Sequence, residues 1–400
     1  MRILMVSPFL PYPPVAGGHA QVLHWIRRLS RDHELAFVGF YEREREAQHC
    51  GKLREHCRVV KARLRAATPH AYGSFSQLPR LVTEFYAREL AADIAAVASG
   101  FQPDVVHFLS TNMAQYRRFV KGVPAAVTAL DIAFVAHERR IAAVPGLARL
   151  RARCEWMRML RYETAVFRRS QHVIAVSDRE AGIVEAVAPA TPVTAVPPGV
   201  DPQLLAPRRR HPVPGSVLYV GHMEHYPNLD GLLFLYGEIW PEVVRACPEA
   251  RLTVAGTGAR EELARVAPDV LAAIQGDESV TLAGFLPDLQ GTMDATSAMA
   301  APMRLGSGVR NKVIESIAAG LPVVTTRRGA EGLAVTHQRE LLMADDAKAF
   351  AAELVRLLRE GELQQKLSAA GRELAVRQHS NEELAKRLEH ALAATAGALA

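Results

Sequence analysis

Short apolar runs alternate with longer amphipathic stretches along the whole chain, and this alternation restricts the fold more than any other feature of the sequence. Parallel strands need long crossover connections, which are usually helices that pack on the sheet. The alternation therefore predicts parallel sheets with helices on both faces. In the first half, the expected strands are residues 2–7, 34–40, 104–108, 124–129 and 172–177. Helical periodicity marks residues 18–31 and 150–170.

The same pattern begins again after a segment rich in proline and arginine. The strands expected in this second series are residues 216–221, 251–256, 279–283, 297–302 and 321–325. Two series in 400 residues predict an α/β protein with two Rossmann-like domains. We expect an N-terminal domain over 1–201, a linker over 202–215, a C-terminal domain over 216–375 and a C-terminal helix over 376–400.

The charge is unevenly divided between the two halves. Residues 1–200 hold 27 basic and 17 acidic side chains, whereas residues 201–400 hold 21 and 25. A basic half attached to a mildly acidic half predicts an anionic partner for the first half. No zinc-finger, basic-zipper or ribonucleoprotein motif is present, so we expect no nucleic acid. A membrane surface or a phosphorylated acceptor fits the pattern better.

The four cysteines are scattered, which is typical of a reducing compartment. Cys50 and Cys57, with His49 and His56 beside them, have no second ligand pair at a zinc spacing, so no metal is expected. The apolar run at residues 2–7 is too short for a signal peptide, and no run of 18 apolar residues occurs. We therefore expect a cytoplasmic protein, with peripheral contact at the inner membrane face as an option.

In open parallel sheets, ligands bind outside the carboxyl ends of the strands. After the first strand, Gly17, Gly18 and His19 lead into a helix, where glycine permits close approach of a ligand and the helix start attracts an anion. An ordinary tight turn explains the two glycines equally well. After residues 216–221, Gly221 and His222 again stand between a strand and a helix, as donor-binding candidates or as plain surface loop residues.

Residues 301–326 form the most informative segment. Gly306-Ser307-Gly308 predicts a flexible turn, and Arg310 and Lys312 then bring two cations into the first turn of a helix. Cations there oppose the helix dipole by roughly 0.3–1 kcal/mol each, whereas a charged hydrogen bond to a phosphate recovers about 1.5–3 kcal/mol. Glu315 follows on the same helical face and can accept two hydroxyl hydrogen bonds, as a ribose offers. A surface ion pair between Lys312 and Glu315 is the alternative.

Residues 147–169 carry seven arginines, and Leu150, Cys154, Met157 and Leu160 trace one apolar helical face. A basic amphipathic helix of this kind can lie on anionic lipid. A helix packed on the N-terminal sheet with a solvated basic face is the competing interpretation.

Residues 301–326 resemble the donor-binding signature of retaining glycosyltransferases of the GT-B, family-four type. Val105-Val106-His107, the turn 196–201, residues 255–258 and Gly284-Phe285-Leu286 resemble further landmarks of that family in order and spacing. Many relatives carry two glutamates with seven residues between them; here Glu315 fills the second position and Ser307 stands at the first. Residues 110–116 and 226–228 resemble an exopolysaccharide-associated branch.

The resemblance implies a GT-B fold, with two Rossmann-like domains facing across a cleft and a C-terminal helix crossing back to the N-terminal domain. It implies a metal-independent hexosyltransferase without cofactor, which takes a nucleotide-diphosphate sugar as co-substrate and passes the sugar to a glycan, lipid-linked or small-molecule acceptor. The implied catalytic residues are Lys312, Arg310 and His107, although a buried histidine at a strand end is the alternative for His107. The implied donor-binding residues are Gly17, Gly18, His19, Gly221, His222, Gly284, Phe285, Leu286, Ser307, Gly308, Val309 and Glu315.

Two rival functions remain open at this point. A nucleotide-sugar epimerase on the same architecture would turn over the donor without an acceptor. A catalytically silent subunit that binds nucleotide sugars is the other, and Ser307 in place of the first glutamate is the feature that favours it.

Overall fold

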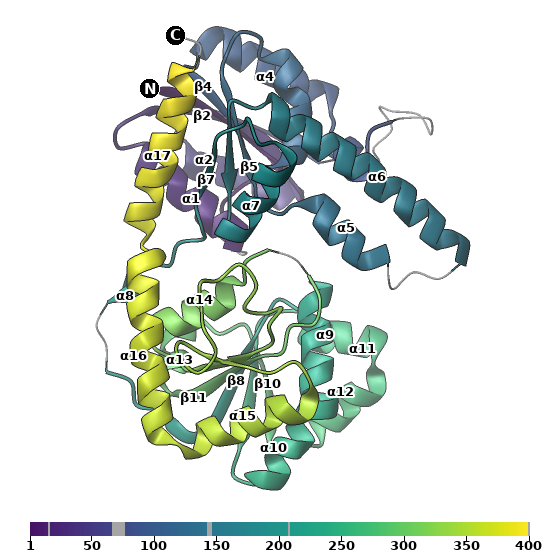
Figure 1. The fold of residues 1–400 in the computed structure, drawn as a ribbon, viewed down its shortest axis with the longest axis vertical. Helices are drawn as coiled ribbons and strands as arrows, with labels where there is room; N and C mark the ends of the chain where they lie inside the picture. Colours follow the sequence, from purple (N-terminus) through teal and green to yellow (C-terminus); the bar gives the residue numbers. More distant parts are fainter. Residues whose placement is uncertain (15–16, 66–76, 142–145, 207–208, 307, 399–400) are drawn as a thin grey trace. The chain divides into compact units, whose positions relative to one another are not determined.

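The chain folds into two compact units (Figure 1). The computed structural model describes residues 1–14, 17–65, 77–141, 146–206, 209–306 and 308–398. Unit 1 comprises Met1–Pro198 and Asn381–Ala400, and unit 2 comprises Gly199–Ser380. The chain therefore passes from one unit to the other at two places.

Unit 1 is built on a seven-stranded parallel sheet in the order β3-β2-β1-β4-β5-β6-β7. Its strands are β1 (Arg2–Ser7), β2 (Glu34–Tyr41), β3 (Val59–Leu64), β4 (Val105–Phe108), β5 (Ala125–Ala129), β6 (His172–Ala175) and β7 (Val193–Ala195). Every strand expected in the first half is present. The two edge strands β3 and β7 were not expected, because only short or partly exposed apolar runs mark them.

Helices cover both faces of this sheet. They are α1 (Gly17–Leu29), η1 (Glu44–His49), α2 (Cys50–Leu53), α3 (Arg80–Thr83), α4 (Arg88–Phe101), η2 (Thr111–Phe119), α5 (Ala133–Ile141), α6 (Gly146–Arg169), α7 (Asp178–Val187) and α17 (Asn381–Gly397). Helices α1 and α17 share one core with Ile3, Met5 and Ala126, while α4 and η2 share another with Leu4 and Val127. Because successive strand residues point to opposite faces, the two cores lie on opposite sides of the sheet.

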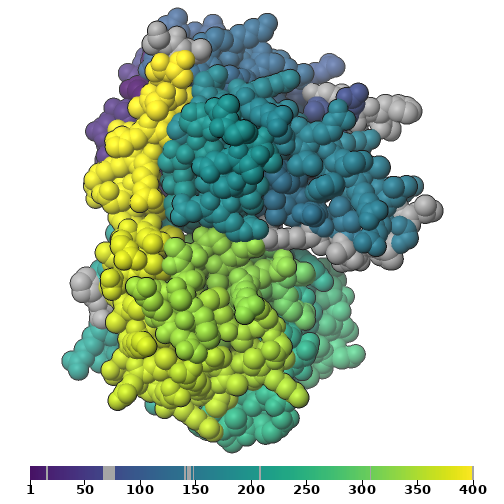
Figure 2. All heavy atoms as spheres, viewed as in Figure 1, coloured from purple at the N-terminus to yellow at the C-terminus, as the bar shows by residue number. Residues whose placement is uncertain are grey.

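The last helix, α17, completes unit 1 although it is separated from the rest of that unit by 182 residues of unit 2. Leu384, Leu388 and Leu392 are buried in the same core as Val22 and Ile26 of α1. Figure 2 shows α17 in yellow beside the purple N-terminal residues of unit 1. A helix from the end of the chain therefore supplies part of the first core.

Helix α6 packs with a different face from the one its apolar residues predict. Leu150 and Met157 are 60% and 50% exposed, and Cys154 is also exposed. The buried side chains of α6 are instead Met159, Glu163 and Phe167. Leu160 packs partly on the same core, so of the four apolar residues Leu150, Cys154 and Met157 stay exposed, as a helix lying on lipid would require. The buried glutamate on the packed face has no mark in the apolar periodicity.

Unit 2 contains a six-stranded parallel sheet in the order β10-β9-β8-β11-β12-β13. Its strands are β8 (Val213–Val220), β9 (Arg251–Ala255), β10 (Val280–Gly284), β11 (Thr296–Ala301), β12 (Val323–Thr325) and β13 (Leu342–Met343). The five expected strands are all present, and β13, a two-residue edge strand, was not expected.

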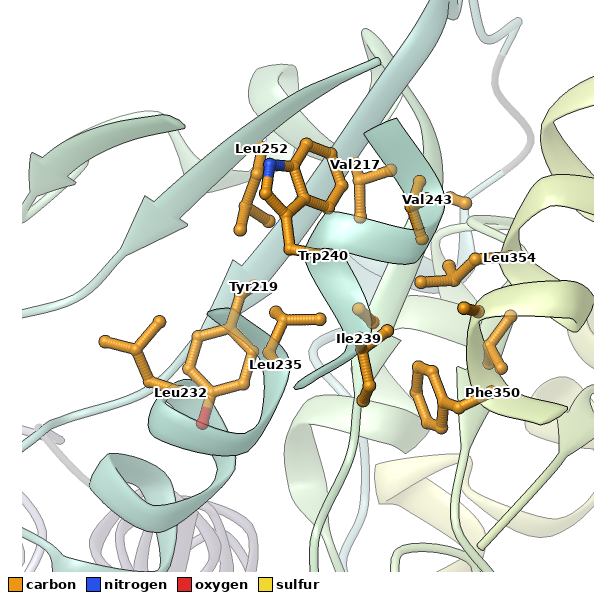
Figure 3. Close-up of a cluster of buried hydrophobic side chains, with 14 of the residues drawn as sticks. Val217, Tyr219, Leu232, Leu235, Ile239, Trp240, Val243, Leu252, Phe350 and Leu354 are labelled. Atoms are coloured by element: carbon orange, nitrogen blue, oxygen red, sulfur yellow. The ribbon is translucent and has the colours of Figure 1, made fainter. Parts of the chain in front are cut away.

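The helices of unit 2 are α8 (Pro202–Leu205), α9 (Tyr226–Phe234), η3 (Leu235–Ile239), α10 (Trp240–Ala246), α11 (Ala259–Val266), α12 (Pro268–Gln275), α13 (Leu289–Asp294), α14 (Asn311–Ala318), α15 (Ala347–Arg359) and α16 (Gly361–Gln378). Figure 3 shows the larger core, where Tyr219 and Val217 of β8 lie among side chains of the segment that runs from α9 to α10. On the other face, α14 buries Val313, Ile314 and Ile317 against Leu218 and Met299.

The segment expected to be a linker belongs to unit 2. It contains α8 and the first residues of β8. Within it, the Arg210 guanidinium donates hydrogen bonds to the carbonyl oxygens of Gly320 at 2.6 Å, of Met293 at 3.1 Å and of Thr296. Burial lowers the pKa of Arg210 to about 10. A proline-rich and arginine-rich composition is therefore no proof of a free linker, because one arginine here joins three segments of the unit.

No helix within the described ranges combines the length and the apolar character needed to cross a membrane.

Candidate functional site

Three glycine turns meet at the carboxyl ends of neighbouring strands in unit 2. Gly221 follows β8 and donates its N–H to the Ala255 carbonyl oxygen at 3.0 Å, and Gly256 follows β9 and donates to the Gly284 carbonyl oxygen at 2.7 Å. Gly256 has a φ of 118°, and a Cβ there would collide with the carbonyl of Gly221. The turns can approach this closely because they have no side chains.

Gly221 lies directly against the side chain of Asn228, near the start of α9. A Cβ on Gly221 would lie 2.9 Å from the Asn228 Cγ atom. The Asn228 amide Nδ2 donates to the His222 carbonyl oxygen at 2.9 Å, and its Oδ1 accepts from the Lys312 Nζ at 2.7 Å. Asn228 is 9% exposed and therefore fixes the turn after β8 relative to α14.

Lys312 is the second residue of α14, and neutral groups surround its ammonium. Besides Asn228, Nζ contacts the Met303 sulfur at 3.8 Å and lies 5.1 Å from the centroid of the Tyr219 ring. The pKa of Lys312 is lowered to about 7, mainly by burial and also by the charge of Arg310, whereas Glu315 opposes the shift. The ammonium is thus partly desolvated beside partners that carry no negative charge, which an arriving anion would supply.

Glu315 follows Lys312 by one turn of α14. Burial raises the pKa of this carboxyl group, the charge of Asp201 raises it further, and Lys312 opposes the shift. The two side chains, both in the described part of the chain, form no ion pair within 4 Å. The Lys312 Nζ contacts Asn228 instead. The surface ion pair that was the alternative explanation of this spacing is therefore absent from the described structure.

Arg310 immediately precedes α14, and its guanidinium points inward rather than into bulk solvent. The side chain is 9% exposed, and its Nη2 donates to the Leu305 carbonyl oxygen at 3.2 Å. Gly306, with a φ of 93°, lies so close that a Cβ would be 2.9 Å from this Nη2. Gly308 also has a positive φ, of 77°. Gly306 of the predicted turn thus lies against the arginine; Ser307 lies outside the described residues.

The remaining donor-binding candidates of unit 2 differ in exposure. Gly284 ends β10 with a φ of 67°, and Phe285 after it is 72% exposed, whereas Leu286 packs on the core below α14. Val309 packs on the same core. His222 is solvent-facing, with its Nδ1 2.5 Å from the Thr257 hydroxyl and its Nε2 3.3 Å from a Glu224 carboxylate oxygen.

The candidates of unit 1 lie at the carboxyl end of β1. Gly17 and Gly18 begin α1, and His19 stacks on Phe9 with ring centroids 4.2 Å apart. Burial lowers the pKa of His19, although Glu42 and Glu46 oppose this shift. A Cβ on Gly18 would meet only Phe9, at an ordinary 3.8 Å, so sterics do not require glycine there. Their donor-binding role stays a prediction.

His107 lies inside the sheet of unit 1. Its ring is fully buried, its Nε2 is 2.6 Å from the Thr128 hydroxyl, and it packs beside Trp25. Burial lowers the pKa of His107 to about 3, so the ring is neutral. A side chain without exposed surface cannot touch a substrate in this conformation. The geometry therefore favours the alternative interpretation, a buried histidine at a strand end, and His107 has no part in the function proposed below.

The structure thus joins the candidates of unit 2 into one row of contacts that runs from Gly284 through Gly256, Gly221 and Asn228 to Lys312. Sequence reasoning left out Asn228, Tyr219 and Met303. A small polar residue seven positions after a glycine at a strand end was a usable signal for Asn228. No sequence signal places the Tyr219 ring beside a lysine that lies far along the chain, whereas Met303 belongs to the same segment as Lys312.

Within the part of the chain that the structure describes, no group of three or more His, Cys, Asp or Glu side chains gathers as metal ligands would.

The class of protein follows from this architecture: two parallel α/β units, the second carrying strand-end turns and an N-terminal helix turn that supplies cations. Residues 15–204 match the family model described as Glycosyltransferase Family 4, and residues 214–360 match that of Glycosyl transferases group 1. Together with the fold, these matches support a glycosyltransferase of the GT-B type.

Solved structures show the same fold. Sucrose-phosphate synthase from Thermosynechococcus elongatus superposes with a TM-score of 0.72 over 98% of both chains, at 17% identity. HepE of Anabaena, solved in complex with UDP-glucose, gives a TM-score of 0.71 over 98% of this chain and 99% of that one, at 12% identity.

A curated relative is an uncharacterized 44.6 kDa protein in the cps region of Klebsiella pneumoniae, which is 30% identical over 145 residues. The match spans 35% of this chain and 36% of that protein, about a third of its length.

Proposed function

We propose that this chain transfers a sugar from a nucleotide-diphosphate sugar to a glycan, lipid-linked or small-molecule acceptor, with retention of anomeric configuration. The observation that carries the proposal is the environment of Lys312, whose ammonium is held by an amide oxygen, a sulfur and an aromatic ring at the start of α14. A diphosphate beside Nζ would supply the missing negative charge. HepE of Anabaena, which has the same fold, was solved with UDP-glucose, and this also supports a nucleotide-sugar donor.

In this reaction the bond between the anomeric carbon and the diphosphate oxygen breaks, the acceptor oxygen bonds to the same carbon, and the proton of the acceptor hydroxyl passes to an oxygen of the leaving diphosphate. Negative charge therefore accumulates on the leaving nucleotide diphosphate. Lys312 would hold it directly, while Arg310 and the free N–H groups at the start of α14 would add positive potential. These cations do the work that a divalent metal does elsewhere. The sequence also lacks an Asp-x-Asp motif, so we propose a metal-independent transferase without cofactor.

The nucleoside would be held by the residues on either side of this charge. Glu315 lies one turn after Lys312 and would accept hydrogen bonds from the two ribose hydroxyls. The exposed ring of Phe285, at the end of β10, offers an apolar face for the base. Gly221 and Gly284 would let the donor approach the backbone of the strand-end turns.

The acceptor and the cellular site are further parts of the proposal. Similarity to a protein in a cps region supports a role in exopolysaccharide assembly. On α6, Leu150 and Met157 are exposed between arginines, which is the composition of a helix that lies on anionic lipid. We propose a cytoplasmic protein in peripheral contact with the inner membrane face.

The decisive experiment incubates the protein with labelled nucleotide sugars, with and without a lipid-linked acceptor. We expect a labelled product only when the acceptor is present. An α-linked donor should give an α-linked product. Epimerised donor in the absence of acceptor would establish the rival epimerase. Donor binding with no turnover under any condition would establish the silent subunit, which the serine at position 307 favours.

A further inference from the structure

Unit 1 contains a cavity of about 1190 Å³ where η2 and α6 diverge over the sheet. Its walls are η2, the turn that precedes β5, and one face of α6. Partly buried apolar side chains, among them Ala114, Val123 and Val166, form part of the lining. Binding pockets for small molecules commonly measure about 300–1,000 Å³, so this cavity can hold an organic molecule as well as a simple ion.

The charge of the described lining has one sign. Its charged members are all cations: Arg117, Arg118, Lys121, Arg158, Arg161 and Arg169. Arg158 pairs with Glu155, outside the lining, at 3.4 Å. Within the described part of the chain, Lys121, Arg161 and Arg169 form no ion pair. Cations gathered without carboxylates repel one another, and an anion in the cavity would remove that cost.

Arg117 is held ready for such an anion. Its Nη2 donates to the Gln171 Oε1 at 2.9 Å, and the same oxygen accepts the Ala125 N–H at 2.9 Å, so the guanidinium is fixed to the start of β5. Its Nη1 is buried and has no hydrogen-bond partner among the described residues. Burial lowers the pKa of Arg117. A buried donor without a partner is unfavourable, and an acceptor oxygen at Nη1 would remove that cost.

The cavity is separate from the candidate donor site. Lys121 and Gln171 precede β5 and β6, so this end of the cavity lies at the amino ends of the strands. The candidate residues Gly17, Gly18 and His19 follow β1 at the opposite end of the same sheet, and Lys312 belongs to unit 2.

We propose that this cavity is a second anion site that binds a phosphate ester, with the phosphate on Arg117, Arg161 and Arg169 and the organic part against Val123 and Val166. The shared chemistry is the phosphate group, whether it belongs to a soluble phosphorylated compound or to the headgroup of an anionic lipid. The inference goes beyond glycosyl transfer and does not depend on it.

The first test titrates inorganic pyrophosphate into the full chain by calorimetry, in a Lys312→Ala background that weakens binding at the donor site. The cavity variant is Arg161→Glu/Arg169→Glu. The matched control is Arg151→Glu/Arg153→Glu, which makes the same charge change on the same helix outside the cavity. We expect the cavity variant to weaken pyrophosphate binding by about tenfold or more, which is the loss of at least one charged contact, and the control to change it by less than about twofold. Equal affinity in all three proteins would overturn the proposal, as would an equal loss in the control.

A second measurement identifies the source of the phosphate. The same proteins are sedimented with vesicles of phosphatidylcholine alone or mixed with phosphatidylglycerol. Anionic-vesicle binding that the cavity variant loses and the control keeps supports a lipid headgroup. Pyrophosphate binding without a difference on vesicles supports a soluble phosphate ester. If the cavity variant keeps both pyrophosphate binding and anionic-vesicle binding, the proposal is contradicted for either source of the phosphate.

Discussion

Two buried titratable groups, one in each unit, have pKa values shifted to about 7, but their surroundings differ. In unit 1, Glu163 accepts hydrogen bonds from the Thr111 hydroxyl at 2.8 Å, the Ala133 N–H at 3.2 Å and the Phe134 N–H at 2.9 Å. In unit 2, Lys312 has one short hydrogen bond, to the neutral Asn228, and otherwise contacts a sulfur and a ring. A carboxylate that already holds three donors serves the fold, whereas a cation that has no carboxylate in contact is arranged for a ligand.

The largest effect should be on stability and should come from removing Glu163, the carboxyl group that accepts three hydrogen bonds. Glu163→Ala leaves the Thr111 hydroxyl and two N–H groups at the start of α5 without their acceptor. We expect the free energy of unfolding to fall by about 3 kcal/mol, measured by urea denaturation, with the donor affinity of the folded protein unchanged. Glu185→Ala on the exposed side of α7 is the control and should be neutral. A loss of donor affinity at full stability would mean that Glu163 also serves the ligand.

Removal of Lys312 should have the reverse effect, so that activity falls while stability is kept. Lys312→Ala should lower kcat at least tenfold, about 1.4 kcal/mol of barrier, because charge on the leaving diphosphate loses its nearest cation. Thermal unfolding should be unaffected or slightly stabilised, since a desolvated ammonium is removed. Lys366→Ala on the exposed face of α16 is the control in the same unit. A near wild-type rate would remove Lys312 from the catalytic machinery.

The shifted pKa of Lys312 should also make donor binding depend on pH. Its pKa in the free protein is about 7, and a bound diphosphate raises it, so binding takes up a proton above pH 7. Donor affinity should be constant just below pH 7 and fall by up to about tenfold per pH unit above it, the limit for one linked proton. Calorimetry in buffers of different ionisation enthalpy measures the proton uptake directly. Lys312→Arg, which stays charged, should flatten the profile.

The smallest of these effects should come from Glu315. Glu315→Ala should weaken nucleotide binding by about 0.5–1.5 kcal/mol, the typical net value of a hydrogen bond, without unfolding the protein. A nucleotide with ribose and its 2′-deoxy analogue should then bind the variant equally well. Glu373→Ala, exposed on α16, provides the matched control. Unchanged affinity for the ribose form would place Glu315 outside the site.

Much of the fold could be predicted because buried parallel strands are continuous apolar runs. All ten strands expected from such runs are present, while β3, β7 and β13 were missed because edge strands are short or half-exposed. The buried face of α6 could not be read from apolar spacing, since Glu163 is buried by hydrogen bonds rather than by hydrophobicity. The contacts of Arg210, which precedes β8, could not be predicted for a similar reason. They are hydrogen bonds to backbone carbonyl oxygens, which the apolar pattern does not indicate.

The candidate site could be predicted where local sequence sets the backbone. Gly306 and Gly308 adopt positive φ, and Lys312 starts a helix, as the sequence indicates. Two partners of Lys312 could not be predicted, because Asn228 and Tyr219 belong to α9 and β8, which meet α14 only in the folded unit. His107 illustrates the opposite limit: a polar residue at a strand end can point into the core.

The return of the chain to unit 1 at Asn381 has a consequence for biosynthesis. A nascent polypeptide that has emerged as far as Ser380 already contains every residue of unit 2 as one uninterrupted segment. The first sheet at that stage still lacks the leucines of α17 that cover Val22 and Ile26. Unit 1 therefore cannot complete its core until unit 2 and α17 have been synthesised, and until then part of its apolar surface stays exposed.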